Sequence, residues 1–275
     1  MEQEIASLLN KNANRIKKHP YLVNGLILAE LKGKYSDKEI LKRLETPNTE
    51  ELTQYGNYDD YYKYRTIDNR IYLLSDLLDN KSVLDIGCHY GKIAKDIYFN
   101  CTCKYYLGCD IDHHLIRKAK HKLVDFVLEQ VYKLPRSVAT HLSIKDKTRL
   151  LLHHKIQFEY ADIMRYTIDY SFDVILCLSV IKWIHLEHLD SGLESFFRNM
   201  YALLEPDGLF VLETYDVDSY YKKLHPMNYA NFLKLEYTPK DYNDLLIKEG
   251  FSFVKTIECD QSHGFQPRSL LLYKK

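Results

Sequence analysis

The amino-acid sequence predicts an α/β fold in which a doubly wound, mostly parallel β-sheet carries helices on both faces. Short apolar segments typical of strands alternate with longer amphipathic segments typical of helices. A right-handed crossover between parallel strands places its helix on one face of the sheet, so this alternation predicts a sheet covered on both sides. The last two strand candidates have too short a connection for a crossover helix, and we therefore expect them to pair antiparallel.

The N-terminal part of the chain is predicted to be a helical appendage over residues 1–50. Apolar residues recur there at spacings of three and four, for example at Ile5, Leu8 and Leu9. Residues 51–275 are expected to form the main domain, which begins with a tyrosine-rich segment over residues 54–70. A chain of 275 residues is long enough for one such large domain plus the appendage.

Strand and helix candidates follow one another through the main domain. The strand candidates are Ser82–Ile86, Tyr105–Asp110, Lys155–Tyr160, Phe172–Leu178, Leu209–Glu213, Phe251–Ile257 and Ser269–Tyr273. The main helix candidates are Ile71–Leu78, Asp112–Val131, Leu189–Leu204 and Pro239–Lys248. Only Glu258–Arg268 separates the final two strands, which is why an antiparallel pair is expected at the end of the sheet.

Charge and hydropathy narrow the classes of partner. The chain has 38 basic and 38 acidic residues and no polybasic tail, so a nucleic acid would have to bind a local basic patch. Short basic runs occur at Arg117–His121 and Lys222–Lys223, although such runs are more often only solvated faces. No apolar run approaches the roughly 18 residues of a membrane span, and Met1–Lys18 lacks the apolar centre of a signal peptide. We therefore expect an intracellular protein without membrane contact.

The six cysteines are scattered, and several fall within apolar strand-like segments, as buried reduced thiols do. Cys101 and Cys103 form the only close pair, and their spacing is not that of a zinc-binding knuckle. We therefore expect neither disulfides nor a metal site.

A glycine-containing loop is predicted at the end of the first strand. The segment Val83–Gly91 places Asp85, Gly87 and Gly91 where that strand turns into a helix. Glycine permits a tight turn and the close approach of a ligand, and the helix N-terminus offers free N–H groups. The spacing D-x-G-x-x-x-G differs from the G-x-G-x-x-G of dinucleotide-binding enzymes and argues against NAD.

Two further aspartates follow the next two strands. Asp110 ends the second strand, where a carboxylate can accept hydrogen bonds from both ribose hydroxyls of an adenosine. Asp162 lies just beyond the third strand, where a carboxylate can accept a hydrogen bond from the adenine amino group. The alternative is that Asp85 and Asp162 are helix caps and that Asp110 is a turn residue. Their order along alternating strands and helices favours an adenosine-containing cofactor.

Four stretches of the sequence carry a family resemblance: YGNYDDYYKYR (Tyr55–Arg65), LDIGCHYG (Leu84–Gly91), CLSVIKWIHL (Cys177–Leu186) and GFQPR (Gly264–Arg268). Together they resemble the RNA methylphosphate-capping enzymes, also called bicoid-interacting-protein methyltransferases. The third stretch is the most specific, because generic methyltransferases do not share it. The resemblance implies a class I methyltransferase (Rossmann-like) fold, S-adenosyl-L-methionine as the cofactor, and methylation of the 5′-terminal (γ) phosphate of a small non-coding RNA.

The resemblance also implies roles for individual residues. By position, cofactor contacts fall on Tyr55, Arg65, Gly87, Cys88, His89, Asp110, Ile111, Asp162, Ile163 and Leu178. The residue that grips the RNA 5′ phosphates corresponds to Lys182, and further substrate-binding candidates are Tyr58, Lys63, Trp183 and His185. The family implies nuclear residence, and RNA-binding proteins of the same ribonucleoprotein particle as partners.

The sequence departs from the family pattern at three places. His89 stands where the family usually has Asn, which should leave cofactor binding intact because the loop works through its backbone. The segment Glu213–Tyr221 replaces a proline-rich segment and falls on the substrate side. Pro267 and Arg268 occur in the reverse of the usual order. The second departure puts the identity of the RNA in doubt.

Methyl transfer to a phosphate requires positioning more than acid–base catalysis. Displacement from a sulfonium is in line and needs the nucleophile about 3 Å from the methyl carbon. A 5′ phosphate oxygen is already anionic at neutral pH, so no general base is expected, and no Ser/His/Asp or Cys/His arrangement is obvious. We expect Lys182, at the carboxyl edge of the fourth strand, to hold the phosphates in register.

Alternatives remain open for these residues and for the function. Lys182 could be a solvated lysine at a helix start, Trp183 a core residue and His185 a polar surface histidine. The tyrosines could form a packed lid helix, or some rings could stack on the first RNA base. The protein could instead methylate an RNA 5′ monophosphate, a small molecule or a protein side chain. It could also be a non-catalytic RNA-binding scaffold, although the intact Asp85 and Asp110 weigh against this.

Overall fold

The computed structural model describes residues 1–44, 52–58, 61–62, 68–135, 137–213, 215–259 and 268–275. The chain divides into two compact units. A helical unit comprises Met1–Tyr58, Lys182–Ser195 and Tyr215–Asp244, and a sheet unit comprises Asp59–Ile181, Phe196–Thr214 and Leu245–Lys275. The helical unit is wider than the 1–50 appendage expected from the sequence, because it includes two segments from later in the chain.

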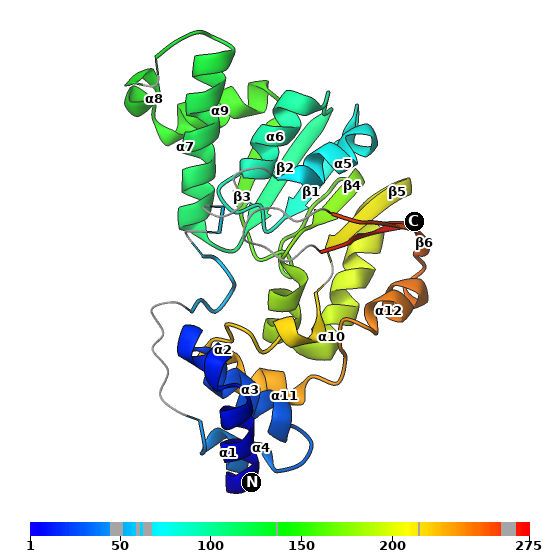
Figure 1. Cartoon of the computed structure of the whole chain (residues 1–275). Coiled ribbons are helices and arrows are strands. Elements are labelled where there is room, and N and C mark those ends of the chain that lie inside the picture. Colours follow the sequence, from blue (N-terminus) through cyan, green and yellow to red (C-terminus); the bar gives the residue numbers. More distant parts are fainter. Residues whose placement is uncertain (45–51, 59–60, 63–67, 136, 214, 260–267) are drawn as a thin grey trace. The chain divides into compact units, whose positions relative to one another are not determined.

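The sheet unit is built on a seven-stranded sheet in the order β3-β2-β1-β4-β5-β7-β6 (Figure 1). Its strands are β1 (Ser82–Ile86), β2 (Tyr105–Asp110), β3 (Ile156–Tyr160), β4 (Phe172–Cys177), β5 (Leu204–Glu213), β6 (Ser252–Ile257) and β7 (Leu270–Lys274). Strands β1 to β5 run parallel, and β7 is antiparallel to both β5 and β6. The predicted fold class and the antiparallel terminal pair are thus confirmed.

Strand β5 is longer than the sequence predicted. It begins at Leu204, which pairs with Phe172 of β4 before the register between the two strands shifts. Regular pairing resumes with Leu209 opposite Val174. The prediction found only this second, regular part, because polar residues interrupt the apolar pattern before Leu209.

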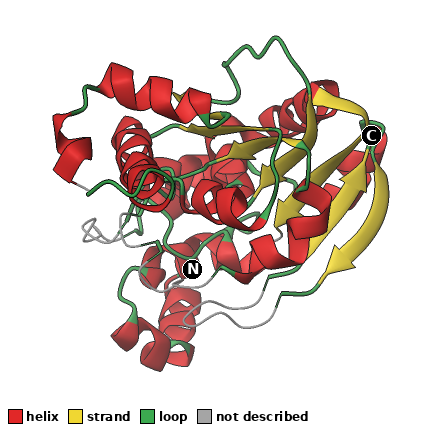
Figure 2. Ribbon diagram, turned by 90° about the horizontal axis from the view of Figure 1, so that it is seen from above, coloured by secondary structure: helices red, strands yellow, loops and turns green. Residues whose placement is uncertain are grey.

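Helices cover both faces of the sheet (Figure 2). Those of the sheet unit are α5 (Asn69–Leu78), α6 (Lys92–Asn100), α7 (His113–Gln130), α8 (Ser137–His141) and α9 (Ile144–His153). On one face, Val83 of β1 and Phe158 of β3 belong to a core that also contains buried residues of α5, α6 and α7. On the other face, the Phe210 ring of β5 lies 6.4 Å from the ring centroids of Phe196 and Phe197. Successive strand residues therefore point into two different cores.

Helix α10 (Ile181–Leu203) is the element that the sequence placed least well. The prediction covered only Leu189–Leu204, whereas the helix starts directly after the β4 loop. Leu189 interrupts it with φ 61° and ψ −171°, so two helical segments meet there. The first segment carries Lys182 and Trp183, and residues Lys182–Ser195 belong to the helical unit.

The helical unit assembles N-terminal helices with segments from the second half of the chain. Its further helices are α1 (Glu2–Lys11), α2 (Ala13–Lys18), α3 (Leu22–Leu31), α4 (Asp37–Leu41) and α11 (Tyr229–Lys234), and α12 (Tyr242–Lys248) begins in this unit. The Lys32 ammonium, just after α3, donates hydrogen bonds to the carbonyl oxygens of Phe232 (3.0 Å) and Leu235. Asn24 of α3 donates to the Tyr229 hydroxyl at 3.1 Å. Among the described helices, none has the length and apolar character needed to cross a membrane.

Candidate functional site

The glycine loop lies at the point where the order of the parallel strands reverses. From β1 the chain proceeds outward to β2 and β3, and then returns to β4 on the other side of β1. Open α/β sheets bind ligands at such a switch point, at the carboxyl ends of the strands. The carboxyl ends of β1 and β4 are neighbours here, with Ile86 opposite Cys177.

The backbone of the glycine loop has a conformation that favours glycine. Gly87, His89 and Gly91 have φ angles of 70°, 53° and 74°. A Cβ atom at Gly87 would lie 2.9 Å from a Val180 methyl carbon, and one at Gly91 would lie 2.8 Å from Cζ of Phe158. The loop therefore needs glycine at both positions, for its backbone conformation and for its close packing on Val180 and Phe158.

Asp110 connects the end of β2 to this loop. Its Oδ2 accepts a hydrogen bond from the backbone N–H of His89, and its Oδ1 accepts one from the N–H of Asp112, both at 2.9 Å. Burial raises the pKa of Asp110 to about 6. A carboxylate has about four acceptor positions, so Asp110 can also accept from a ribose hydroxyl. The alternative interpretation was that Asp110 is only a turn residue. Its hydrogen bond to the backbone of the glycine loop gives it a further role, because it holds that loop.

The other two aspartates, Asp85 and Asp162, differ in burial and in hydrogen-bond partners. Asp85 is a buried strand residue, and its Oδ2 accepts a hydrogen bond from the Tyr106 hydroxyl at 2.5 Å. Because it lies within β1, Asp85 is no helix cap, and burial raises its pKa to about 7. Asp162 is 24% exposed, and its Oδ1 accepts the N–H of Met164 at 3.0 Å, as in a turn. The Ala161 N–H donates to the Asp110 carbonyl at 2.9 Å, which places Asp110 and Asp162 on neighbouring strand ends.

The remaining predicted cofactor residues divide between the two units. In the sheet unit, Cys88 and Leu178 are buried, and Ile111 and Ile163 are half-buried just beyond β2 and β3. Tyr55 is half-buried in the helical unit. Two predicted residues, Arg65 and Lys63, lie outside the described residues.

Two residues of the tyrosine-rich segment pack against the glycine loop within the sheet unit. The Tyr61 and Tyr62 rings lie 5.8 and 5.4 Å from the His89 ring, and Tyr62 lies 5.1 Å from Tyr90. His89 is only 6% exposed, so its imidazole is part of this aromatic packing. Its backbone N–H meanwhile binds Asp110, which agrees with our expectation that the loop works through its backbone.

A buried ionic network at the carboxyl ends of β4 and β5 was missed from the sequence. Arg70 donates to both Asp68 carboxylate oxygens at 2.8 and 2.6 Å, and to Oε2 of Glu213 at 2.8 Å. Ser179 donates to the same Glu213 oxygen and accepts a hydrogen bond from the Tyr61 hydroxyl at 2.7 Å. One feature of the sequence could have suggested part of this network: Glu213 is an acid at the end of an otherwise apolar strand.

In the helical unit the structure brings together three of the predicted substrate-binding residues. Lys182 is 3% exposed, and its ammonium donates to the carbonyl oxygens of Ser219 (2.6 Å) and Lys222 (2.8 Å). The same ammonium lies 4.4 Å from the Trp183 ring centroid, and the Trp183 and Tyr58 rings are 6.3 Å apart. Lys182 is therefore not the solvated lysine of the alternative interpretation. Its partners are backbone atoms of the segment beyond β5, where the sequence departs from the family pattern.

Tyr58 and Trp183 form the aromatic part of this cluster. Trp183 packs so closely on Gly56 that a Cβ atom there would lie 2.1 Å from its Nε1. The Lys223 ammonium lies 4.8 Å from the Tyr58 ring centroid. Burial raises the pKa of Tyr58 to about 12, so its hydroxyl keeps its proton at neutral pH.

His185, a predicted substrate-binding residue whose alternative interpretation was a surface histidine, lies in the interior of the helical unit. It is fully buried, with Nδ1 2.9 Å from the Tyr220 hydroxyl and Nε2 2.7 Å from Oδ1 of Asp190. Because Asp190 can only accept, Nε2 carries a proton and Nδ1 accepts from Tyr220. Burial lowers the pKa of His185, which favours this neutral form at pH 7. Its contacts support the first segment of α10 from inside, and in this structure it presents no atom to a substrate.

Comparisons with known proteins agree with this geometry. A general methyltransferase-domain model matches residues 84–210, and the Bicoid-interacting protein 3 (Bin3) model matches residues 172–275. The U6 snRNA methylphosphate capping enzyme Amus of Drosophila melanogaster is 34% identical over 212 residues, which cover 74% of this chain and 67% of that protein. The chain belongs to the Bicoid-interacting protein 3 family.

Other relatives of this Bicoid-interacting protein 3 family member align with it over different fractions of their own length. A probable RNA methyltransferase of Arabidopsis thaliana is 29% identical over 264 residues, which cover 82% of each chain. The human 7SK snRNA methylphosphate capping enzyme is 27% identical over 270 residues, which cover 80% of this chain but 39% of that protein. The solved structure of the N-methyltransferase NodS from Bradyrhizobium japonicum WM9 with S-adenosyl-L-homocysteine has a TM-score of 0.53 at 15% identity, covering 87% of this chain and 98% of that one. At this sequence identity, the structural similarity to NodS shows only that the two proteins share a fold.

The sheet unit fits the cofactor of such methyltransferases, S-adenosyl-L-methionine. An adenosine needs acceptors for its ribose hydroxyls, and Asp110 supplies a carboxylate at the end of β2. The methionine end needs close approach to backbone, and the Gly87 position leaves no room for a side chain. The family model and this donor set together make the protein an S-adenosyl-L-methionine-dependent methyltransferase.

Proposed function

We propose that this protein methylates the 5′-terminal γ-phosphate of a small non-coding RNA. The observation that carries the proposal is the match to the Drosophila U6 and human 7SK snRNA methylphosphate capping enzymes over 74% and 80% of this chain. Another relative, a pre-miRNA 5′-monophosphate methyltransferase of Xenopus laevis, is 29% identical but aligns with only 55% of this chain. The broader coverage by the capping enzymes favours a triphosphate end over a monophosphate end.

The proposed reaction needs no acid–base group from the protein. S-Adenosyl-L-methionine supplies an activated methyl group on a sulfonium. A γ-phosphate oxygen attacks the methyl carbon, the carbon–sulfur bond breaks, and its electron pair stays on sulfur to give S-adenosyl-L-homocysteine. No proton moves, because the phosphate oxygen is already anionic at pH 7. The contribution of the chain is to hold the phosphate in line.

Lys182 is the residue that we propose for this positioning. It is the second residue of α10, which starts directly after the β4 loop. Its ammonium now donates to two neutral carbonyl oxygens. Phosphate oxygens are stronger acceptors for an ammonium because the hydrogen bond is charge-assisted. We infer that the triphosphate takes the place of one or both carbonyl partners. The adjacent Trp183 and Tyr58 rings supply faces on which the first base can stack.

Isotope-labelled S-adenosyl-L-methionine and short RNAs with triphosphate, monophosphate or hydroxyl 5′ ends test this function. We expect label on the triphosphate RNA and none on the hydroxyl RNA. Label preferentially on the monophosphate RNA would replace the γ-phosphate assignment. No label on either phosphorylated RNA, with cofactor binding intact, would refute the proposed function.

The role of Lys182 is tested by comparing Lys182→Ala with Lys32→Ala. Both lysines belong to the helical unit, and both donate to two backbone carbonyl oxygens. We expect Lys182→Ala to lower kcat/KM for the triphosphate RNA about a hundredfold, and Lys32→Ala to leave it nearly unchanged. Equal losses, with equal shifts in thermal unfolding, would show that Lys182 is only structural.

The partners and location follow from the same proposal. An enzyme acting on small nuclear RNA would work in the nucleus and meet the RNA-binding proteins of the same particle. Tagged protein expressed in cells, followed by sequencing of the RNA that copurifies with it, identifies the RNA. An RNA pool without small nuclear RNAs would contradict this part of the proposal.

A further inference from the structure

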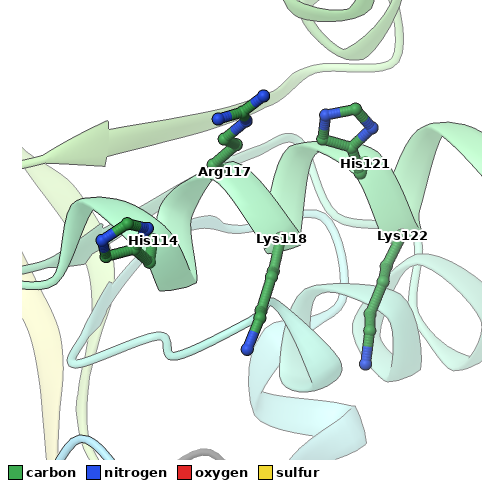
Figure 3. Close-up of a pocket in the computed structure, with 5 residues that line it drawn as sticks. All are labelled: His114, Arg117, Lys118, His121 and Lys122. Atoms are coloured by element: carbon green, nitrogen blue, oxygen red, sulfur yellow. The ribbon is translucent and has the colours of Figure 1, made fainter.

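The fold fixes the ammonium of Lys182, in contrast to the basic side chains of α7. On α7, Arg117, Lys118 and Lys122 are exposed around a pocket (Figure 3). Lys182 is only 3% exposed, and two backbone carbonyl oxygens accept its hydrogen bonds. A long side chain loses conformational entropy when it is fixed in one place. The position of the Lys182 ammonium therefore depends on the backbone that carries these two oxygens.

The two acceptors lie in a short segment, residues 219–222, which we call the acceptor segment. Ser219 is the last residue of a short 3-10 helix, and Lys222 follows three residues later. No proline occurs between Pro206 and Pro226, so no ring restricts the backbone angles of this segment. Tertiary contacts must therefore set the positions of the two carbonyl oxygens.

Tyr220 anchors the acceptor segment through a chain of buried hydrogen bonds. It is 4% exposed, and its hydroxyl donates to Nδ1 of His185 at 2.9 Å. Nε2 of His185 in turn donates to Oδ1 of Asp190 at 2.7 Å. The Tyr220 oxygen is also hydrogen-bonded to the Tyr242 hydroxyl, which donates because the Tyr220 proton is already used. The chain of donors thus runs in one direction and ends on the Asp190 carboxylate.

The carboxylate at the end of this chain is itself held by backbone groups. Oδ2 of Asp190 accepts the N–H of Glu236 at 2.7 Å, and Oδ1 accepts that of Tyr237 at 3.3 Å. Lys182 and His185 are three residues apart in the first segment of α10, so they lie on the same side of the helix. This helical segment therefore contacts the acceptor segment twice, through the Lys182 ammonium and through the His185 ring.

Helix α3 also contacts the acceptor segment. Gly25 of α3 packs so closely on it that a Cβ atom there would lie 2.1 Å from the carbonyl oxygen of Tyr221. All of these residues belong to the helical unit. The acceptor segment is therefore held by a close backbone contact as well as by the side chain of Tyr220.

We propose that Tyr220 and His185 are positioning residues for the methyl transfer, which hold the acceptor segment so that the Lys182 ammonium is fixed before the RNA binds. This inference rests on the proposed function and assigns a role in it to two buried residues. A lysine that is fixed in advance loses less conformational entropy when the triphosphate replaces a carbonyl partner. An in-line transfer is also sensitive to small displacements of the phosphate. His185, which the sequence suggested as a substrate-binding residue, then acts through Lys182.

Trp183 provides a readout that needs no substrate. It is the only tryptophan of the chain, and the Lys182 ammonium lies 4.4 Å from its ring centroid. Its fluorescence, excited at wavelengths longer than tyrosine absorbs, reports on the charge beside this ring. Tyr220→Phe removes only the hydroxyl, and we expect it to shift the emission maximum in the same direction as Lys182→Ala does. Combining the two substitutions should give no further shift.

Tyr229→Phe is the matched control for this measurement. Tyr229 is 7% exposed and belongs to the helical unit, and its hydroxyl accepts a hydrogen bond from Asn24. The control should leave the emission of Trp183 unchanged. An unshifted emission in Tyr220→Phe, or the same shift with and without the Lys182 side chain, would overturn the inference.

Kinetics with a 5′-triphosphorylated RNA test whether the same contact serves the reaction. Because a misplacement of about 1 Å can cost about a hundredfold in rate, we expect Tyr220→Phe to lower kcat about tenfold. KM should stay nearly unchanged, since the charge of Lys182 remains. In the Lys182→Ala background, Tyr220→Phe should have no further effect on kcat, and Tyr229→Phe should match the wild type. Independent, multiplicative losses, or an unchanged kcat in a Tyr220→Phe protein with shifted emission, would overturn the role in the reaction.

Two substitutions at His185 separate the two hydrogen bonds of its ring. His185→Asn keeps an acceptor near the position of Nδ1 for the Tyr220 hydroxyl, whereas His185→Gln keeps a donor near that of Nε2 for Asp190. We expect His185→Asn to retain more of the wild-type kcat, and an equal or reversed order would overturn Tyr220 as the anchor. A wild type that methylates no phosphorylated RNA would overturn the proposed function, while the emission of Trp183 would still decide whether Tyr220 fixes Lys182.

Discussion

The buried network around Arg70 should contribute far more stability than an exposed ion pair of the same kind. Arg70 is 4% exposed and holds two carboxylates, Asp68 and Glu213, that are each 1% exposed. Replacing it in Arg70→Met keeps the apolar stem but removes the guanidinium from both buried carboxylates. Removing one partner of a buried ion pair is destabilising by about 3–5 kcal/mol, most of which is the desolvation of the charge left behind. We expect Arg70→Met to lower the free energy of unfolding by that amount at pH 7.

Arg198 offers a matched control within the sheet unit. Its guanidinium also makes two hydrogen bonds to one carboxylate, that of Glu249, at 3.1 Å, but its side chain is 63% exposed. Solvent screening limits such a pair to about 0–1 kcal/mol, so Arg198→Met should be nearly neutral. Urea unfolding at pH 7 followed by circular dichroism measures both variants.

The effect of pH provides a second readout for the same variant. Without Arg70, burial should favour the protonated forms of Asp68 and Glu213 in the folded variant. The folded variant then binds more protons than the unfolded chain, so its stability increases as pH falls from 7 to 5. The difference in the free energy of unfolding between the wild type and Arg70→Met should therefore become smaller over this pH range. Equal and small losses for Arg70→Met and Arg198→Met, independent of pH, would refute the assignment of a stabilising buried network.

Two further predictions concern the cofactor loop. Gly87→Ala should weaken S-adenosyl-L-homocysteine binding in titration calorimetry, because its φ is 70° and the new Cβ would lie 2.9 Å from Val180; unchanged affinity would show that the loop can relax without loss. The affinity of the wild type should also fall as pH drops through about 6, since burial raises the pKa of Asp110 to about 6 and its protonation removes the charged acceptor. Asp110→Asn should bind S-adenosyl-L-homocysteine more weakly by about 1.5–3 kcal/mol, and its affinity should not depend on pH in this range. A similar pH profile in both proteins would exclude Asp110 as the titrating group.

Local patterns in the sequence were sufficient for the sheet and for the cofactor loop. The short apolar segments of β1 and β2 placed both strands at their observed bounds, because a strand buried on both faces must be largely apolar along its length. The loop between Gly87 and Gly91 could be recognised because the need for positive φ restricts residue type at each position. Asp110 was recognised as a ligand-binding candidate from its position at a strand end.

The same reasoning found only the second segment of α10, for a physical reason that is local. Leu189 adopts φ 61°, a conformation uncommon for residues other than glycine, and nothing in its side chain indicates this. The break depends on the packing of the two segments on either side. The first segment was therefore not predicted as a helix, and Lys182 was placed only at the carboxyl edge of the fourth strand.

The sequence by itself determined the fold class, the antiparallel pairing of the last two strands, the glycine loop and an adenosine-containing cofactor, because each of these follows from local strand and helix patterns and from the residue types at their ends. Only the tertiary structure decided that Lys182 donates to carbonyl oxygens of Ser219 and Lys222, and that Arg70 joins Asp68 to Glu213. It also decided that the buried Lys147 of α9 lies 2.7 Å from Nδ1 of His121 on α7. These are contacts between distant segments, and the environment of a charged side chain depends on which distant atoms surround it after folding.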